Sequence, residues 1–518
     1  MLCHAPPMSK LLLPSLLAAL GAFSTLTAQD AAPVVLTAAA PATAPAKTAK
    51  PAPPPPAPDD PFVKGSAGAK KPAPTPAEEA PRPVNYQALL ETFDLSREDF
   101  VALLDEKGDD EARYRRVAEW MSAGRAKLVT FTALTVRSGM RRTVVESIDE
   151  VNYATELNPP QAEEDAAFPA AFETRNTGET LELELTVGED GQHADVNIAP
   201  NFCRLVKFTD DFASPGRANS AVSQPRFATR KLTTAVRLTM NRPRLLGTLS
   251  AAGEDGTIAG QVRVVFLTVR PNAIPRARPE ALAPGAGLLR MEYTFFSLDR
   301  AAARELWLAK AEPQICYDAL RALVAERKAR LEHASINVAP SGQRTVTDEI
   351  EELKFATEFN PPGIPDAAGG NSGGSSAPAA GEDKAPKAVS TASARAQLPP
   401  GDWPKKAMIP AVAAAFEVRN IGFTSEVEPV LGEDGATVDT NFALTFIRHL
   451  GPLEVTGIAK TYPPRPLFES RKFNGSASAT VGAQQFLSTF NMPVESSVNG
   501  RKDDGRVWLG FVRVVLVK

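Results

Sequence analysis

Two pairs of glutamates alternate with apolar residues along predicted strands. Glu182 and Glu184 stand in "LELELTV", and Glu426 and Glu428 stand in "SEVEPVL". Because successive strand side chains point to opposite faces, each pair shares one face of its strand. Paired carboxyl groups can act as acid and base in hydrolysis. A solvated strand face explains the same alternation, and we expect that role for all four glutamates.

Three histidines follow residue 28, and their surroundings do not predict a metal centre. His193, His333 and His449 have no second metal-type ligand beside them at ligand spacing. His193 falls in a predicted hairpin loop, where solvation explains it. The sequence also lacks a phosphate-binding glycine loop, a zinc-binding helix motif and a serine elbow. We therefore predict a protein that is not an enzyme, with no catalytic residues, no metal and no cofactor.

The acidic "GEDG" segments and the cysteines are the other residues that could bind a metal or form a covalent bond. The segments occupy 188–191, 253–256 and 432–435, and they lack the alternating oxygen ligands of a calcium loop. Asp-Gly hairpin turns explain them without a metal. Cys203 and Cys316 remain once a signal peptide is removed, and spacing leaves open whether they form a disulfide or stay as two buried thiols.

An unusual octet occurs twice and belongs to a much longer internal match. "YATELNPP" begins at Tyr153 and "FATEFNPP" at Phe355. The match extends upstream over 143–160 and 345–362, where ten of eighteen residues are identical. Downstream, "AFETRNTGETLELELTVGEDGQHADVN" aligns with "AFEVRNIGFTSEVEPVLGEDGATVDTN". Later "PRFATRKLTTAV" aligns with "PLFESRKFNGSA", and "GQVRVVFL" with "GFVRVVLV". A match of this length, with an offset of 202 residues that rises to 244 downstream, indicates a tandem repeat.

Helix signals precede the strands in both copies. Ser96 and Asp299 are at equivalent positions and are good N-cap residues. A second helix is predicted from the apolar stripe Tyr114, Val117 and Met121, which matches Tyr317, Leu320 and Val324. The predicted fold class is therefore α+β, a tandem duplication of a unit with two helices followed by about six to eight strands.

The positions where the internal repeat begins, ends and is interrupted predict how the chain is divided into segments. Residues 1–28 contain Lys10, an apolar run and small residues, which is typical of a secretory signal peptide. The predicted segments are a signal peptide at 1–28, an Ala/Pro-rich disordered tether at 29–84, repeat 1 at 85–270, a linker at 271–290, and repeat 2 at 291–518 with a flexible insert at 363–406. The net charge of −4, with both signs interspersed, argues against a nucleic-acid partner.

The repeated strands resemble a known family. "SGQRTVTDEIEELKFATEFNPP", "FEVRNIGFTSEVEPVLGEDGATVDTN" and "PRFATRKLTTAV" are similar to the carboxyl-terminal homology domain of the secretins, and most to divergent, verrucomicrobial-like members. Secretins form rings in the outer membrane for type II and III secretion and type IV pili. The segments 241–249 and 482–490 lack the family's double-glycine hairpin, so we do not expect a conventional secretin pore.

The resemblance implies a non-catalytic protein of the cell envelope. It predicts a component or accessory of an outer-membrane secretion or pilus system, exported to the periplasm or outer membrane of a Gram-negative-type bacterium. Protein partners of that apparatus, a homo-oligomer and outer-membrane association are the expected partners. The alternative is a soluble periplasmic scaffold or binding protein that keeps the fold and forms no channel. The duplicated Arg175-Asn176 and Arg419-Asn420 are expected to pair within the fold.

Overall fold

The computed structural model describes residues 84–517 with interruptions. The positions left out are 141, 159–167, 210–223, 253–257, 275–286, 311, 361–411, 454–464, 494–498, 500, 502 and 518. The predicted signal peptide, the predicted tether up to residue 83 and the insert at 363–406 therefore lie outside the described residues. The Asp255-Gly256 turn lies outside them too.

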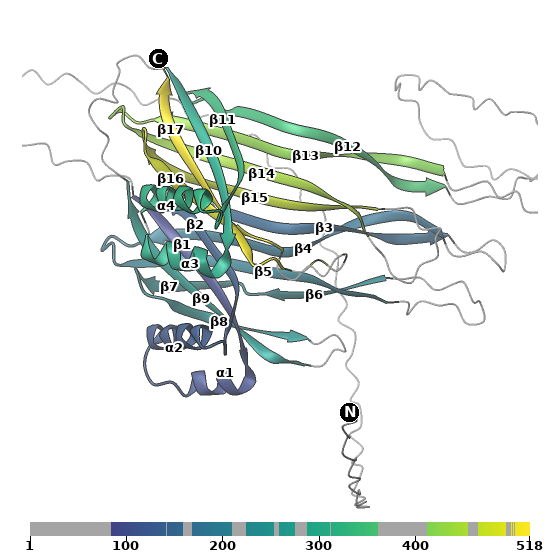
Figure 1. Ribbon diagram of the computed structural model, residues 1–518, viewed down its shortest axis with the longest axis horizontal. Helices are drawn as coiled ribbons and strands as arrows, with labels where there is room; N and C mark the ends of the chain where they lie inside the picture. Colours follow the sequence, from purple (N-terminus) through teal and green to yellow (C-terminus); the bar gives the residue numbers. More distant parts are fainter. Residues whose placement is uncertain are drawn as a thin grey trace, which may run out of the picture. The chain divides into compact units, whose positions relative to one another are not determined.

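Most described residues belong to two large antiparallel sheets (Figure 1). Sheet A has eight strands in the spatial order β11 (Arg330–Pro340), β10 (Leu288–Asp299), β17 (Arg506–Val517), β16 (Gln484–Asn491), β2 (Lys127–Arg137), β1 (Val84–Ser96), β9 (Ile258–Ala273) and β8 (Arg244–Ala252).

Sheet B has nine strands. Its order is β12 (Thr345–Asn360), β13 (Val412–Leu431), β14 (Thr437–Leu453), β15 (Arg465–Thr480), β3 (Thr143–Asn158), β4 (Phe168–Val187), β5 (His193–Thr209) and β6 (Gln224–Lys231), with β7 (Thr234–Thr239) also paired to β5. Each sheet therefore contains strands from both the early and the late part of the chain.

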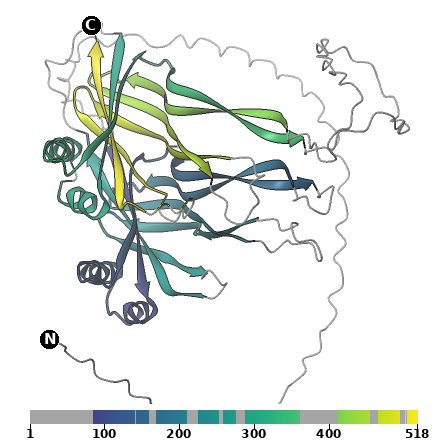
Figure 2. The same ribbon diagram turned by 45° about the vertical axis from the view of Figure 1, so that its right-hand side comes forward.

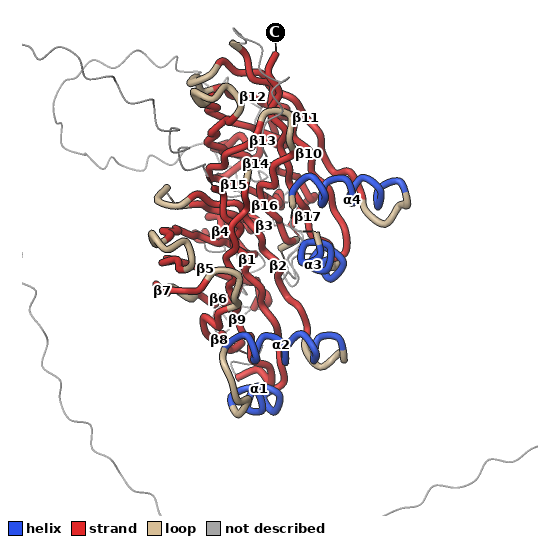
Figure 3. Tube along the Cα trace, turned by 90° about the vertical axis from the view of Figure 1, so that its left-hand side faces the viewer, coloured by secondary structure: helices blue, strands red, loops and turns tan. Residues whose placement is uncertain are grey.

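Four short helices lie on the outer face of sheet A (Figure 3). They are α1 (Arg97–Leu104), α2 (Asp110–Ser122), α3 (Arg300–Ala309) and α4 (Pro313–Ala325). The predicted caps are present, because Ser96 accepts a hydrogen bond from the backbone of Asp99 and Asp299 accepts one from Ala302, each at 3.0 Å. Among the described residues, no helix is long and apolar enough to cross a membrane.

Sheet A is apolar on both faces, and this explains its position between sheet B and the helices. One face joins the main core with sheet B, to which β1 contributes Ala88 and Leu90. The other face packs under the helices, where Phe93 of β1 meets Val117 of α2. Figure 2 shows the helices on the side of sheet A away from sheet B. The predicted helical stripes are buried in these outer clusters.

The two halves of the chain use the same strand order. We call residues 84–273 the first half and 288–517 the second half. In sheet A the order β2-β1-β9-β8 repeats as β11-β10-β17-β16. The helices keep one offset, since α1 begins at Arg97 and α3 begins at Arg300, 203 residues later. Even the irregularity in β8 between Leu245 and Gly247 recurs in β16 between Phe486 and Ser488.

The predicted fold class, α+β with helix-led tandem units, is wrong. The described residues are mostly β, and the halves share two continuous sheets instead of forming separate units of helices followed by strands. The error began with β1 and β10, which precede the helices. Neither was predicted as a strand, and buried polar residues such as Gln87 and Glu91 interrupt the apolar pattern of β1.

Two details of the sequence alignment also change. Val265 lies opposite Thr92, and the equivalent position opposite Phe295 is Gly510. The strand 260–267 therefore corresponds to 505–512, five residues before the segment that matched by sequence. Val-rich strands match one another in several registers, which explains the slip. The predicted linker 271–290 is strand at both ends, because β9 runs to Ala273 and β10 begins at Leu288.

Two glycines at equivalent positions fix a close approach of neighbouring strands. Gly178 and Gly422 follow the repeated Arg-Asn pairs and have φ of 119° and 128°. A Cβ on Gly178 would overlap the carbonyl oxygen of Ser147 in β3, and one on Gly422 would overlap that of Glu349 in β12. Positive φ and contact with backbone together require glycine at these positions.

We predict that Gly178→Ala lowers the free energy of unfolding by about 3 kcal/mol, since strained backbone and overlap with a main-chain oxygen act together. Denaturant unfolding followed by circular dichroism measures this change. Gly260→Ala is the matched control, because its φ is not positive and no atom lies within 4 Å of the added Cβ. Equal stability of the two variants would contradict the assignment.

Candidate functional site

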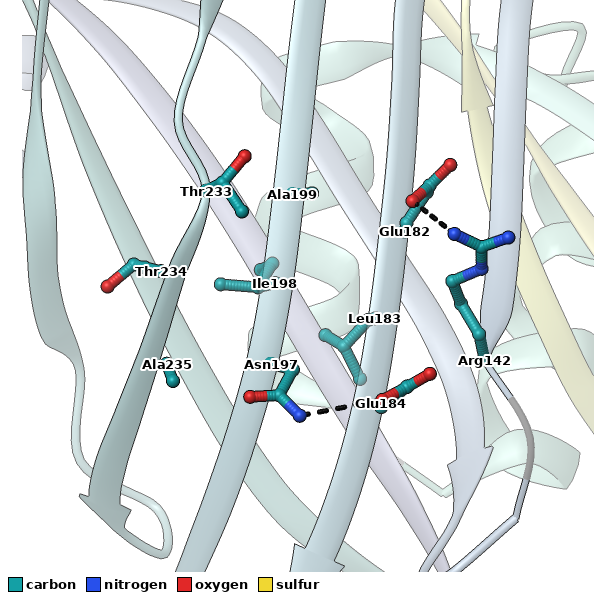
Figure 4. A pocket seen from close by; sticks show the side chains of 10 residues that line it. All are labelled: Arg142, Glu182, Leu183, Glu184, Asn197, Ile198, Ala199, Thr233, Thr234 and Ala235. Atoms are coloured by element: carbon teal, nitrogen blue, oxygen red, sulfur yellow. Dashed lines mark hydrogen bonds and ion pairs between the residues drawn. The ribbon is translucent and has the colours of Figure 1, made fainter. Parts of the chain in front are cut away.

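Glu182 and Glu184 lie on the outer face of sheet B, where they line an open hollow of about 400 Å³ (Figure 4). Glu182 forms a 2.7 Å ion pair with Arg142, and Glu184 accepts a 3.4 Å hydrogen bond from Asn197. The leucines between them point into the core. This matches the predicted solvated strand face.

The same arrangement occurs in the second half, which indicates a structural role. Glu426 pairs with Arg344 at 2.5 Å, just as Glu182 pairs with Arg142. Both ion pairs join the start of one long strand to its neighbour across the sheet. Opposite charges at facing strand positions support strand pairing, and this gives Glu182 and Glu426 a structural role.

The histidines lie in three different environments. His193 is exposed and pairs through Nδ1 with Asp190 at 2.6 Å, which lowers the pKa of Asp190 to about 2. His333 packs against Phe423 with ring centroids 4.5 Å apart, and burial lowers its pKa. His449 is exposed beside Phe468. Within the described ranges, no three His, Cys, Asp or Glu side chains converge as a metal site would require.

The cysteines and repeated arginines are also accounted for by packing. Cys203 and Cys316 are both buried and unbridged, which answers the question left open by the sequence. Burial raises the pKa of the Cys316 thiol to about 12, so it stays protonated and unreactive. Arg419 of β13 pairs with Glu150 of β3, a contact between the halves. Arg175 is exposed, with its guanidinium 6.0 Å from the Phe227 ring.

The most distinctive polar site is the junction between the halves, where β15 of the second half pairs with β3 of the first. Seven residue pairs form this antiparallel contact, from Phe468 opposite Glu150 to Asn474 opposite Val144. Lys472 and Glu146 face each other there in a 3.2 Å ion pair. We call these residues, with the contacts between β16 and β2 and around α3, the internal junction.

Two buried carboxylates face each other at the internal junction. Glu469 lies opposite Asp149, and both are essentially excluded from water. Arg501 bridges them, donating to Asp149 at 2.9 Å and to Glu469 at 2.5 Å. Burial alone would raise the pKa of Glu469, but the positive charges of Arg471, Arg448 and Arg501 outweigh it and hold this pKa below its ordinary value.

In sheet A the junction is closed by side chains instead of a full backbone ladder. Ser488 of β16 and Leu134 of β2 are directly opposite. Thr489 donates to the carbonyl of Phe131 at 3.0 Å and accepts from the backbone N–H of Ala133 at 2.8 Å. These bonds satisfy the edge of β2 in a site that excludes water, where an unpaired backbone group would be costly.

Helix α3 closes the outer face of the junction. Arg304 pairs with Glu91 of β1 and donates to the Tyr114 hydroxyl at 2.6 Å, although α3 belongs to the second half. Trp307 is fully buried and carries Arg270 over its ring at 4.7 Å. The helix thus contributes a cation and an aromatic anchor to the other half.

Sequence reasoning did not find Asp149, Glu469, Arg501 or Arg304. Their importance depends on contacts between residues that are far apart in the chain, 213 residues for Arg304 with Glu91 and 352 for Arg501 with Asp149, and local patterns do not contain that information. A signal was present in the stretch "FESRKF", since three charged residues there stand between two phenylalanines. The pattern alone could not show that this strand is internal to a sheet.

Comparisons with known proteins found weakly similar structures and no matching family. No protein-family model and no curated protein matches the chain. Two solved structures show weak likeness, each at 11% identity. The type II secretion system secretin GspD of E. coli K12 has a TM-score of 0.14, covering 36% of this chain and 47% of its own. ExeD of Aeromonas hydrophila has a TM-score of 0.17, covering 47% and 54%.

Both neighbours are secretins of type II secretion, the family that the repeated strands resemble. The chain spans about half the length of these two proteins. At such TM-scores the likeness carries no argument about this chain.

We predict that Arg501→Ala destabilises the protein by about 3 kcal/mol at pH 7, because two facing carboxylates remain buried without their shared cation. Urea unfolding measures the change. Arg237→Ala is the control, since its ion pair with Asp195 is 68% and 60% exposed, and an exposed pair contributes little.

The pH dependence separates a charge effect from lost packing. In the unchanged protein the pKa of Glu469 is depressed, so its contribution is present above the unfolded pKa and is lost as pH falls through the folded value. In Arg501→Ala the pKa of Glu469 rises, and protonation relieves the repulsion as pH falls. The two stability curves should therefore converge toward pH 4, and a constant difference would contradict this account.

Proposed function

We propose that the protein is a non-catalytic, secretin-like protein of the cell envelope that works by assembly. In this proposal it is a component or accessory of an outer-membrane secretion or pilus system, exported to the periplasm or outer membrane. The resemblance of the repeated strands to the secretin homology domain supports this placement.

The observation that carries the proposal is the internal junction itself. Two similar sets of strands are joined edge to edge into continuous sheets (Figure 1). Among the described residues, β6, β8 and β11 each have one edge without a strand partner, and the outer edge of β12 is paired only at Glu358, which lies opposite Ala171 of β4. An open edge presents unpaired backbone groups to a neighbouring chain, and edge pairing is an established way for proteins to associate. A protein of this construction is suited to building larger sheets with partners.

The candidate chemical residues favour the same proposal. The repeated glutamates hold neighbouring strands, the cysteines are buried thiols, and His333 packs within an aromatic cluster. Each of these side chains therefore has a structural role, and we propose that none of them acts in catalysis.

We predict that the protein, expressed with its own amino terminus in a Gram-negative host, is recovered from the envelope in complexes larger than one chain. Osmotic shock, membrane fractionation and native gel electrophoresis measure this. A version lacking residues 1–28 is the control and should remain in the cytoplasm.

Three outcomes separate the alternatives. Envelope complexes support the proposal. Recovery of a monomer from the periplasm favours the soluble scaffold or binding protein. Hydrolysis of peptidoglycan or peptide by the purified protein, lost in Glu182→Gln or Glu184→Gln, would overturn the non-catalytic assignment.

A further inference from the structure

The two outer ends of the sheets match the two sides of the internal junction. At the junction, β15, β16 and α3 of the second half meet β3, β2 and α2 of the first half. The equivalents of the first set are β6, β8 and α1, which lie at one end of the sheets. The equivalents of the second set are β12 and β11, which are the edge strands at the other end, and α4, which lies against β16 (Figure 1).

Register shows which residues are equivalent. Lys472 lies opposite Thr445 in β14, and Lys231 lies opposite Asn201 in β5, which is the matching position. Glu146 of β3 likewise corresponds to Asp348 of β12, since they lie opposite Thr180 and Thr424 in the matching strands. The partly exposed junction pair Lys472–Glu146 thus corresponds to Lys231 at one end and Asp348 at the other.

The two ends carry opposite charges, as the two sides of the junction do. Strand β6 carries Arg226, Arg230 and Lys231. The facing edge at the other end, β12, carries Asp348, Glu349, Glu351 and Glu352. In the junction register, Arg230 would lie opposite Glu349 and Lys231 opposite Asp348. Opposite charges at facing strand positions stabilise pairing, and like charges oppose it.

Apolar side chains are exposed at both ends where the junction buries their counterparts. On β11, Ile336 is 59% exposed, whereas its counterpart Ala133 on β2 is fully buried against β16. On α1, Leu104 is 57% exposed, whereas its counterpart Trp307 on α3 is fully buried. Val101 on α1 and Val338 on β11 are exposed as well. Exposed apolar residues on an open edge mark a surface that binds a partner.

We propose that a second copy of this chain binds head to tail, so that β6, β8 and α1 of one chain cover β12, β11 and α4 of the next in the geometry of the internal junction. This inference rests on the proposed assembly function and names its partner. The contact joins two different surfaces, so each added chain again presents both ends. Repetition gives a closed ring or an open filament, depending on the rotation between chains.

Cysteine cross-linking tests the register directly. Residues opposite each other in antiparallel strands have Cα atoms about 4.5–5.5 Å apart, within the range that a disulfide spans. We expect the purified Lys231→Cys/Asp348→Cys double variant to form a ladder of disulfide-linked multimers on mild oxidation. A mixture of the two single variants should stop at dimers, because each chain then has one reactive end.

Two controls use the same chain. Glu146→Cys/Lys472→Cys places the pair at the internal junction and should give an intrachain disulfide with no multimers. Lys231→Cys/Val346→Cys shifts one cysteine by two residues along β12, to an exposed position, and should cross-link at least tenfold less. The native Cys203 and Cys316 are buried, so they should not contribute.

Charge reversal gives a second, independent readout. Lys231→Glu and Asp348→Lys should each weaken self-association at least tenfold in sedimentation velocity, and the combined variant should restore it. The internal-junction cross-link reports that each variant is folded.

Monomers in the double variant, together with a normal intrachain control, would overturn the inference. Dimers formed by Lys231→Cys alone would also overturn it, because they require like ends to meet. Either result leaves the proposed function intact if the protein is still found in envelope complexes with other proteins. Loss of those complexes is the separate failure of the proposed function.

Discussion

Pairing of β15 with β3 is the interaction on which the architecture depends. It joins strands more than 300 residues apart and turns two sets of strands into one continuous sheet B. Sheet A follows, because β16 and β2 are brought to adjacent positions and their edge is closed by Ser488 and Thr489. The main core then extends across both halves, with Val145 and Phe473 from the paired strands in one apolar cluster. Apolar burial on this scale is the main stabilising term, and it forms only when the edges meet.

Charged side chains are buried inside the junction, so groups of opposite charge must pair with them there. Asp149 and Glu469 could not both remain ionised side by side without Arg501, whose two ends reach one carboxylate each. Arg471 adds a second cation, stacked 4.1 Å from the Trp508 ring. A buried ionic network of this kind contributes little net stability relative to apolar packing, but removing one member is costly. It therefore acts mainly to fix the register in which the two halves meet.

The sequence predicted local features well and long-range ones poorly. The caps at Ser96 and Asp299 and the stripe around Val117 were correct, because caps and helical periodicity are encoded within a few residues. The glutamate strands were correct for the same reason, since alternation is a local signal. The fold class was wrong because β1 and β10, which precede the helices, were not predicted as strands, and buried polar residues such as Gln87 and Glu91 interrupt the apolar pattern of β1. Arg304 was missed because its partner Glu91 lies in the other half, and no local pattern specifies such a contact.

The internal junction joins two halves of one chain, whereas a contact between the outer ends would join two separate chains. The residues at the two places differ accordingly. The halves are covalently linked, so their effective concentration is high and the junction tolerates two buried carboxylates. At the outer ends the residue equivalent to Glu469 is Ala228, while Glu351 takes the place of Asp149. Pairing there would face one carboxylate with a methyl group instead of a second carboxylate. A contact between separate chains lacks the high effective concentration that a linker gives. Because alanine replaces one of the two carboxylates, such a contact would avoid the desolvation cost of burying the second charge.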